Sequence, residues 1–340
     1  MNARVRMLPI FGLSMVGAVA SGSTTAHAST TDASDAGAPS WSTEFVANGG
    51  QWPAVTFQPG GSATFGVADP LADDGKVVEL LIPGAPGEGP LYDVGPRFGT
   101  QITTPTVFRY GTFRARFEPA TCASTEDVVN GFFTYFNDGK DENGNGIIDN
   151  SEVDIEILCG NPQVVSLVIW TDYTSDASFL GLSRQINLAT GAYSQSESAD
   201  SYGQTPMGTL PQFVIPQFPQ ADTYYEVGFD WEPAEVRFFI VVGGTEITLW
   251  DYTDAAHIPT HTSSLNFNLW HPSTHWASDN SAANYPANNA IERIDWARVW
   301  PSPPASETPA VPGWACVSLG LLLGALGVGV LAGRRRGAPA

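Results

Sequence analysis

Short apolar runs separated by turn-forming residues extend through most of the chain. The runs are rich in Val, Ile, Phe, Tyr and Thr, and Gly, Pro, Asn and Asp separate them, which is the pattern of β-strands and their connections. The clearest predicted strands are Val77–Ile82, Gly111–Phe117, Val128–Tyr135, Val153–Ile157, Val164–Trp170, Tyr224–Trp231, Val236–Val242, Thr245–Trp250 and Ile291–Val299. Gly243-Gly244 predicts a tight hairpin, because primed turns need positive φ at their centre. No run in this region keeps a 3.6-residue apolar period, so the sequence predicts an all-β sandwich.

The N-terminal segment differs from this pattern. Residues 1–28 carry two early Arg residues, an apolar run and a final Ala-His-Ala. Small residues at this point suit secretory cleavage, so the segment is predicted to be a signal peptide. Residues 29–300 are then long enough for one large β-domain with its own core. We expect the protein to be secreted or held in the cell envelope.

The C-terminal segment has its own composition. Residues 301–312 are rich in Pro, Ser and Ala and are predicted to be a linker. Residues 313–336 contain an uncharged stretch long enough to cross a bilayer, followed at once by Arg334, Arg335 and Arg336. A permanent anchor helix is one interpretation. The order of these features also resembles bacterial C-terminal sorting tags, which are cleaved after export. Membrane contact is expected through this segment alone.

Charge and cysteine content narrow the choice of partners. The chain has 35 acidic and 15 basic residues, and its formal net charge is −20. Such a charge repels nucleic acid and suits a neutral partner. We expect a monomer. Cys316 lies in the C-terminal apolar stretch, which leaves Cys122 and Cys159 in the domain. Export permits a disulfide between these two, but spacing alone leaves two free thiols as an open alternative.

Three acids alternate with aliphatic residues in one predicted strand. Glu152, Asp154 and Glu156 therefore share one face. Glu152 and Glu156 are about 13 Å apart along the strand, and side chains that lean together leave about 5 to 6 Å between the carboxyls, the separation found in retaining glycosidases. Asp154 lies between them and can separate their two pKa values. The alternative is an ordinary solvated sheet face, on which water relieves the repulsion.

Six short pieces carry a family resemblance. They are Tyr110 to Phe117, Gly131 to Tyr135, Glu152 to Leu158, Gly228 to Trp231, Asn268 to Trp270 and Ile294 to Trp296. In this order the pieces resemble glycoside hydrolase family 16, the group of licheninases and xyloglucan transglycosylases. The resemblance implies a concave jelly-roll sandwich of the lectin and glucanase type. It also implies that Glu152 is the nucleophile, Asp154 the assisting acid and Glu156 the general acid/base.

The same resemblance suggests substrate contacts. Strand Glu152 to Glu156 has no inserted residue, as in the licheninase-like branch, where aromatic rings line the cleft. The matching positions are Phe133, Tyr135, Trp170, Trp270 and Trp276. Such rings stack on sugar faces, whereas core packing is the alternative for Phe133 and Trp270.

Some positions depart from the family pattern. Gln101 and Thr103 stand where licheninases carry a Glu and an Arg, and Val168 replaces a cleft Asn. These departures leave mixed-linkage β-glucan specificity open.

A second motif precedes the acidic strand. Asp141, Asn143, Asn145 and Asp149 match oxygen-ligand positions 1, 3, 5 and 9 of a calcium loop, and the carbonyl of Ile147 matches position 7. The twelfth position is Glu152, and a carboxylate that chelates calcium cannot attack a sugar freely. We therefore expect calcium to bind without Glu152, or with another acid such as Asp138. A turn without metal is the alternative.

The family resemblance implies a separate structural calcium site. Its ligands would be Asp295 and the backbone carbonyl of Gly75. Calcium is thus the one cofactor expected, in a structural role, and the chemistry needs none.

Three functions fit the sequence. The first is a retaining endo-acting β-glycan hydrolase, resembling β-glucanases, with a β-linked polysaccharide as substrate. The second is a transglycosylase that uses the same three acids. The third is a lectin-like module that binds glycan without cleaving it, although such a module has no need for an aligned row of carboxyls.

Overall fold

The computed structural model describes residues 30–32, 39–45, 52, 54–57, 61–86, 99–175, 178–196, 204–210 and 214–302. The predicted signal peptide and C-terminal apolar segment lie outside these ranges, as does the predicted linker beyond residue 302. Within the described ranges, no helix is both long and apolar enough to span a bilayer.

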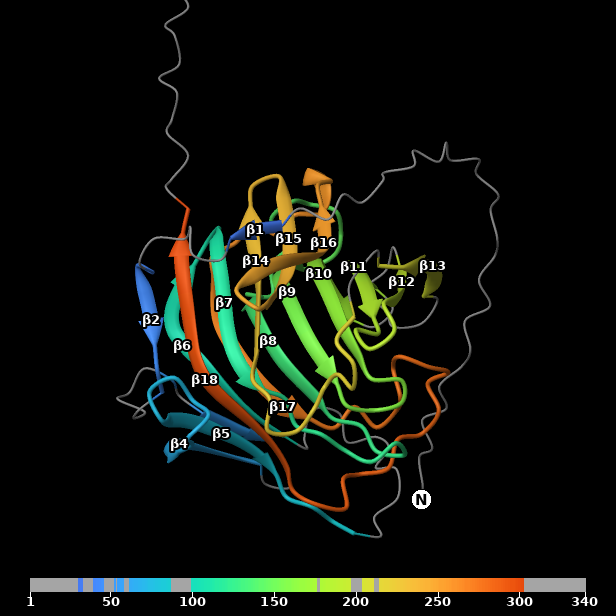
Figure 1. Cartoon of the computed structure of the whole chain (residues 1–340). Coiled ribbons are helices and arrows are strands. Elements are labelled where there is room, and N and C mark those ends of the chain that lie inside the picture. The colour runs from blue at the N-terminus through green and yellow to red at the C-terminus, as the bar shows by residue number, and fades with distance from the viewer. Residues whose placement is uncertain are drawn as a thin grey trace, which may run out of the picture.

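Two antiparallel sheets form the two layers of the molecule (Figure 1). The order in the first sheet is β1 (Thr30–Asp32), β16 (Thr245–Tyr252), β15 (Glu235–Val242), β14 (Tyr225–Glu232), β7 (Gly111–Glu118), β18 (Ala290–Pro301), β5 (Lys76–Ile82) and β4 (Ser62–Ala68), with β2 (Trp41–Thr43) beside β18. The order in the second sheet is β13 (Thr205–Thr209), β12 (Ala192–Ser196), β11 (Ser178–Ile186), β10 (Val164–Ser175), β9 (Asp149–Leu158), β8 (Val129–Phe136), β17 (Ser263–Trp270), β6 (Gly99–Phe108) and β3 (Ala54–Phe57). In the described part of the chain, the helical content is one turn at Ala255–His257. The prediction of an all-β jelly-roll sandwich is confirmed.

The nine strands named from the sequence are all present, but others were missed. β6 contains Pro105, and β17 carries Asn266 and Asn268 among its apolar residues. Pro and Asn are depleted in strands, so both segments lack a clear local signal. Their pairing partners supply the stability that local propensity does not, because β17 lies between β6 and β8.

Aromatic side chains join the two layers in the core. Phe113 and Phe229 of the first sheet stack with ring centroids 4.9 Å apart, and Phe132 and Phe267 of the second sheet stack at 5.0 Å. Phe132 also meets Phe229 across the layers at 5.6 Å. All four are fully buried. Truncating one such ring to alanine costs about 3 to 5 kcal/mol, so this cluster holds β8 and its neighbour β9 against the first sheet.

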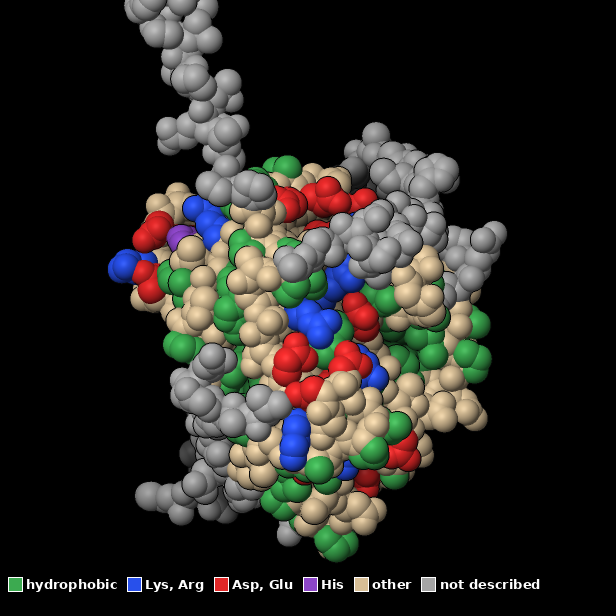
Figure 2. Space-filling view, turned by 60° about the vertical axis from the view of Figure 1, so that its left-hand side comes forward, with side chains coloured by type: hydrophobic (Ala, Val, Ile, Leu, Met, Phe, Trp, Pro, Cys, Tyr) green, Lys and Arg blue, Asp and Glu red, His purple; other side chains and the backbone are tan. Residues whose placement is uncertain are grey.

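The outer face of the first sheet is charged. Figure 2 shows basic and acidic side chains beside one another on the side of the molecule where β18 and β7 lie. Arg114 pairs there with Glu226 and Glu246, and Arg293 pairs with Glu79 and Glu118. On this face, these acidic and basic side chains therefore pair with one another.

A disulfide closes one end of the sandwich. Cys122 and Cys159 are bonded, with their Cα atoms 5.6 Å apart. Of the two states that the sequence left open, the structure shows the bonded one. The bond ties the segment after β7 to the end of β9.

Candidate active site

The three predicted catalytic acids lie on the outer face of β9, a surface we call the carboxyl face. Val153, Ile155 and Ile157 alternate with the acids and are completely buried in the core. This alternation fixes the register of β9, because a slip of one residue would bury the acids and expose the aliphatic side chains. The structure thus brings Glu152, Asp154 and Glu156 together in one row.

Glu152 and Glu156 differ in the hydrogen bonds that their carboxyls accept. The Asn150 amide donates to Glu152 at 2.8 Å, and Asp154 also hydrogen-bonds Glu152. Asn150 precedes Glu152 by two residues on the same strand face, so a period of two could have marked it, although its side chain suggests no chemistry by itself. Both bonds favour the ionised form of Glu152.

Burial raises the pKa of all three carboxyls, because a charged carboxylate is poorly solvated at a buried position. It raises the pKa of Glu152 to about 7, against the lowering effect of the bonds from Asn150 and Asp154. It raises the pKa of Glu156 to about 8, and the charge of Glu152 adds to this. The pKa of Asp154 is raised well above its ordinary value by burial and by the charges on both sides. Glu152 therefore ionises more readily than Glu156.

The neighbouring strands place aromatic side chains opposite Glu152. Tyr135 of β8 and Trp170 of β10 are its cross-strand partners, and Tyr135 is 42% exposed. Trp170 also hydrogen-bonds Asp154. Phe133, by contrast, lies opposite Asp154 and is only 7% exposed, so it presents little surface to a ligand.

Trp170 belongs to an aromatic cluster that the sequence did not predict. Tyr173 and Phe179 meet its ring edge-on, with centroids 5.7 and 5.4 Å away. Phe179 comes from β11, a strand that was not predicted, so its position could not be inferred.

Glycine opens space beside Glu156. Gly131 of β8 pairs with Glu156 on one side and with Asn268 of β17 on the other. A Cβ atom at Gly131 would lie 2.3 Å from Oδ1 of Asn268, so the amide occupies the place of the missing side chain. This oxygen is buried and has no hydrogen-bond partner in the described structure. An acceptor for a protonated carboxyl or a sugar hydroxyl therefore lies next to Glu156.

Gln101 and Thr103, which depart from the licheninase pattern, lie on one side of the carboxyl face. Gln101 donates to Thr103 at 3.0 Å and to Asn266 at 3.3 Å. Asn266 pairs with Phe133, which places this group next to the row of Asp154. Val168 lies on the other side of Asp154. The amides offer neutral donors and acceptors where the family pattern has charge.

Trp270 and Trp276 meet beyond Glu156. Their rings are 4.8 Å apart, and they pack on the small cluster of Val129, Leu158 and Val164. These three residues form the next cross-strand row after that of Glu156. The five predicted aromatic side chains thus surround the acids, three beside Glu152 and Asp154 and two at the far end.

The candidate calcium loop closes through Asp149. Its carboxylate accepts bonds from the backbone of Glu142 at 2.7 Å and from the Asn143 amide at 2.6 Å. Asp141 accepts three backbone N–H groups, from residues 144, 145 and 146. Ile147 donates its own N–H to Asn145. Four oxygen-bearing side chains are therefore held in one compact turn.

Asp172 joins this loop, and the sequence did not indicate it. Both Asn143 and Asn145 donate to its carboxylate, at 3.2 and 3.0 Å. A bulge in β10 between Trp170 and Asp172 shifts the register, so Asp172 lies directly opposite Asp149. Asp172 and Asp149 are 3% and 4% exposed, and His261 lies 3.8 Å from Asp149. Opposed like charges repel, which is the environment a cation relieves.

The second predicted calcium site has protein partners instead. Asp295 is ion-paired with Arg116 and accepts the backbone N–H of Asp73 at 3.1 Å. The carbonyl of Gly75 accepts from the backbone of Asp69 at 3.1 Å. An Arg therefore supplies the positive charge beside Asp295, and the residues present fit a metal ion poorly.

Taken together, fold and site define a two-sheet sandwich with a row of three carboxyls and flanking aromatic rings. No protein-family model and no curated protein matches the sequence. Among solved structures, β-glucanase from Bacillus licheniformis is 15% identical, with a TM-score of 0.45 over 78% of this chain and 99% of that one.

Two further solved structures are similar to the chain. A glycoside hydrolase family 16 endo-glucanase from Bacteroides ovatus, in complex with G4G3G-2F-DNP, is 14% identical, with a TM-score of 0.47 over 76% of this chain and 99% of that one. The apo Crh5 transglycosylase is 16% identical, with a TM-score of 0.46 over 81% and 92%.

Proposed function

We propose that the protein is a secreted, retaining endo-β-glycan hydrolase of the family 16 type. The observation that carries this proposal is the row Glu152, Asp154 and Glu156, in which two hydrogen bonds favour ionisation of the first acid only. A pair of carboxyls with separated pKa values is what acid/base and nucleophilic roles require. A binding module has no use for this costly arrangement, since like charges are concentrated on one strand.

The reaction would proceed by double displacement. The Glu152 carboxylate attacks the anomeric carbon and forms a glycosyl ester, while Glu156 gives its proton to the departing glycosidic oxygen. Glu156 then takes a proton from water, and the resulting hydroxide attacks the same carbon and frees Glu152. Asp154 would donate a hydrogen bond to Glu152 and so tune its charge between the two steps. The strand spacing of about 13 Å between Cα atoms, closed by leaning side chains, favours retention over inversion.

A neutral β-linked glycan suits the carboxyl face. The net charge of −20 disfavours an acidic polysaccharide. Tyr135 and Trp170 offer rings for stacking on one side of the acids, and Trp270 and Trp276 on the other. Gln101, with its neutral amide, lies where the licheninase pattern has charge. The flanking rings favour a β-glucanase-like specificity, whereas the change at Gln101 leaves the linkage open.

Calcium is proposed as a structural ligand of the loop at residues 141–149. Asp141, Asn143, Asn145, Asp149 and the Ile147 carbonyl would supply oxygens, with Asp172 in place of the twelfth residue. When bound, the ion would neutralise the opposed carboxylates of Asp149 and Asp172. Isothermal titration should show calcium uptake by the parent and at least a tenfold loss of affinity in Asp172→Asn. Unchanged uptake in that variant would reject the ligand set.

The proposed reaction is tested by a panel of lichenan, laminarin, xyloglucan, agarose and carrageenan. We expect the parent to release reducing sugar from a β-glucan and Glu152→Gln to lose at least about 10³-fold in kcat. Glu246→Gln, which removes a buried carboxylate from the first sheet, is the matched control and should keep the activity. Proton NMR of the first product should show the β-anomer.

Other outcomes separate the remaining functions. Longer chains formed on adding an acceptor sugar would establish a transglycosylase. A parent that binds glycans but releases no product from any of them would establish a lectin-like module. An α-anomeric first product would refute the retaining assignment, whatever the substrate.

A further inference from the structure

A short hairpin carries Trp276 to the end of the carboxyl face. We define the Trp276 hairpin as residues 273–283. Its backbone bonds run from His275 to Ser281 at 2.9 Å and from Ala283 to Ser273 at 3.0 Å. Trp276 packs from this hairpin against Trp270. The position of the hairpin therefore decides whether the two rings form one platform.

The backbone conformation of the hairpin is not one that its own residues favour. Ser273 and Asn280 have φ values of 67° and 56°, a left-handed conformation that non-glycine residues adopt at a cost. Two backbone bonds give little stability to an isolated two-stranded hairpin in water. Contacts from outside the hairpin must supply the rest.

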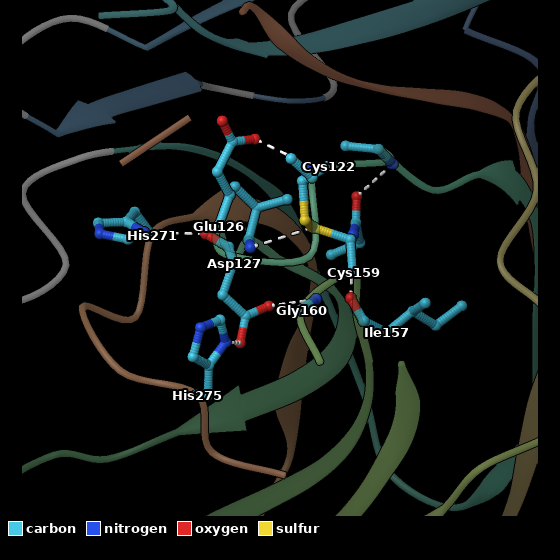
Figure 3. Close-up of a disulfide and its surroundings, with 12 residues drawn as sticks. Cys122, Glu126, Asp127, Ile157, Cys159, Gly160, His271 and His275 are labelled. Atoms are coloured by element: carbon cyan, nitrogen blue, oxygen red, sulfur yellow. Dashed lines mark hydrogen bonds and ion pairs between the residues drawn. A yellow bond between two sulfur atoms is a disulfide. The ribbon is translucent and has the colours of Figure 1, made fainter. Parts of the chain in front are cut away.

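Asp127 contacts the hairpin and two segments beside it (Figure 3). Its backbone carbonyl accepts Nδ1–H of His271 at 2.8 Å, at the point where β17 ends. Its Oδ1 accepts the backbone N–H of Gly160 at 2.7 Å, just past the end of β9. Its Oδ2 lies 3.6 Å from Nδ1 of His275, inside the hairpin. Asp127 is 1% exposed, so all three contacts are shielded from water.

The carboxylate of Asp127 packs closely against the backbone of Gly160. A Cβ atom there would lie 2.4 Å from Cγ of Asp127. Only glycine lets the carboxylate reach the backbone at the end of the catalytic strand. Asp127 thus bridges β9 and the hairpin directly.

The segment that bears Asp127 is itself anchored. Cys122 bonds to Cys159 beside Gly160. Glu126 accepts the backbone N–H of Ala287 at 2.9 Å, and the carbonyl of Thr125 accepts that of Asn284 at 2.7 Å. Both contacts lie just after the hairpin. The segment therefore hydrogen-bonds the chain just after the hairpin, while Asp127 lies 3.6 Å from His275 inside it.

A hollow lies beside the hairpin. A hollow of about 460 Å³ is lined by His275, Ser278 and Asp279 of the hairpin and by Asn161 and Pro162 of the β9–β10 turn. A hairpin released from Asp127 has room to move into this hollow. Such a movement would change the contact between Trp276 and Trp270.

We propose that Asp127 is a positioning residue that holds the Trp276 hairpin against the end of β9, so that Trp270 and Trp276 form a preformed platform for one sugar unit beyond Glu156. This inference rests on the proposed glycan-hydrolase function. It assigns Asp127 no contact with substrate. Its effect reaches the reaction through ligand binding and leaves the chemistry at Glu152 unchanged.

The test compares Asp127→Ala and Asp127→Asn with the parent. Hydrogen–deuterium exchange should become at least about tenfold faster in peptides covering residues 271–285 of Asp127→Ala, while peptides of β8 and β9 stay protected. Asp127→Asn keeps an acceptor for Gly160 and should show a smaller change. It also serves if the alanine variant does not fold. Glu246→Gln, a buried carboxylate of the first sheet, controls for loss of a buried acid.

Kinetics provide the second measurement, on whichever β-glucan the parent cleaves. Loss of one aromatic stacking surface predicts a rise of about tenfold in KM with kcat within about twofold of the parent. Asp127→Asn should recover part of the affinity. Unchanged exchange in the hairpin of Asp127→Ala would overturn the proposal, and so would a fall in kcat without a change in KM. If the parent cleaves no glycan, the proposed function fails, and the exchange data still decide whether Asp127 positions the hairpin.

Discussion

Removal of the Cys122–Cys159 disulfide should destabilise the protein by about 4 kcal/mol. The bond spans 37 residues, and restricting a loop of that length in the unfolded chain corresponds to about 4 kcal/mol at 25 °C. The enclosed residues comprise β8 and β9 and so include the whole acidic row. Native contacts add a smaller contribution, because the backbone of Val128 donates to Sγ of Cys159 at 3.2 Å. A net hydrogen bond of this kind contributes about 1 kcal/mol.

Urea unfolding followed by tryptophan fluorescence would measure this. Cys122→Ala removes the cross-link but keeps the sulfur that Val128 contacts, whereas the double variant with Cys159→Ala removes both. We expect the single variant to lose the contribution of the cross-link, about 4 kcal/mol of unfolding free energy. The double variant should lose about 1 kcal/mol more. A loss below about 1 kcal/mol in the double variant would refute the reasoning. It would mean either that the conformations of the unfolded chain are already restricted in this region or that the disulfide strains the native structure.

Four other predictions follow from the site. The kcat/KM profile should be bell-shaped around neutral pH, because Glu152 must be ionised and Glu156 protonated, and Glu156→Gln should remove the alkaline limb. Folded-state pKa values raised above 4.5 mean that the native protein binds more protons than the unfolded chain, so stability should fall as pH rises from about 4.5 to 8, and less steeply in Glu156→Gln when measured by urea unfolding. Trp170→Phe keeps an aromatic ring but loses the hydrogen bond to Asp154, so kcat should fall about tenfold with little change in KM, and a rise in KM alone would contradict this. A calcium chelator should lower the melting temperature of the parent by more than that of Asp172→Asn, as scanning calorimetry would show.

The sequence was sufficient to predict the acidic row, because strand alternation is a local property. Val153, Ile155 and Ile157 mark the buried face of the strand, so the alternating acids must lie on the opposite face. The same reasoning could not reach Asn268, whose proximity to Glu156 depends on Gly131 and on β17 pairing with β8. Register between strands distant in sequence is set by the assembled sheet, and no short segment records it.

Irregularities in the strands were the other source of missed residues. With regular pairing, Trp170 and Asp172 would share one face of β10. The bulge between them reverses the side on which Asp172 lies, and only then does it oppose Asp149. Asp127 was missed for a different reason. It follows a disulfide-bonded segment without regular structure. Its three partners lie just after β9, just after β17 and in the Trp276 hairpin.

Strand parity also bears on the conflict between the proposed calcium loop and the proposed nucleophile. Asp149 and Glu152 are the ninth and twelfth positions of the loop motif, and both lie in β9. Residues three apart in a strand point to opposite faces. Asp149 accordingly faces the loop, whereas Glu152 faces Asn150 and Asp154 on the carboxyl face. A helix after the ninth position would have returned Glu152 to the loop. Here β10 places Asp172 beside the loop instead. A cation in the loop would therefore brace the start of the catalytic strand while leaving Glu152 free to act as a nucleophile.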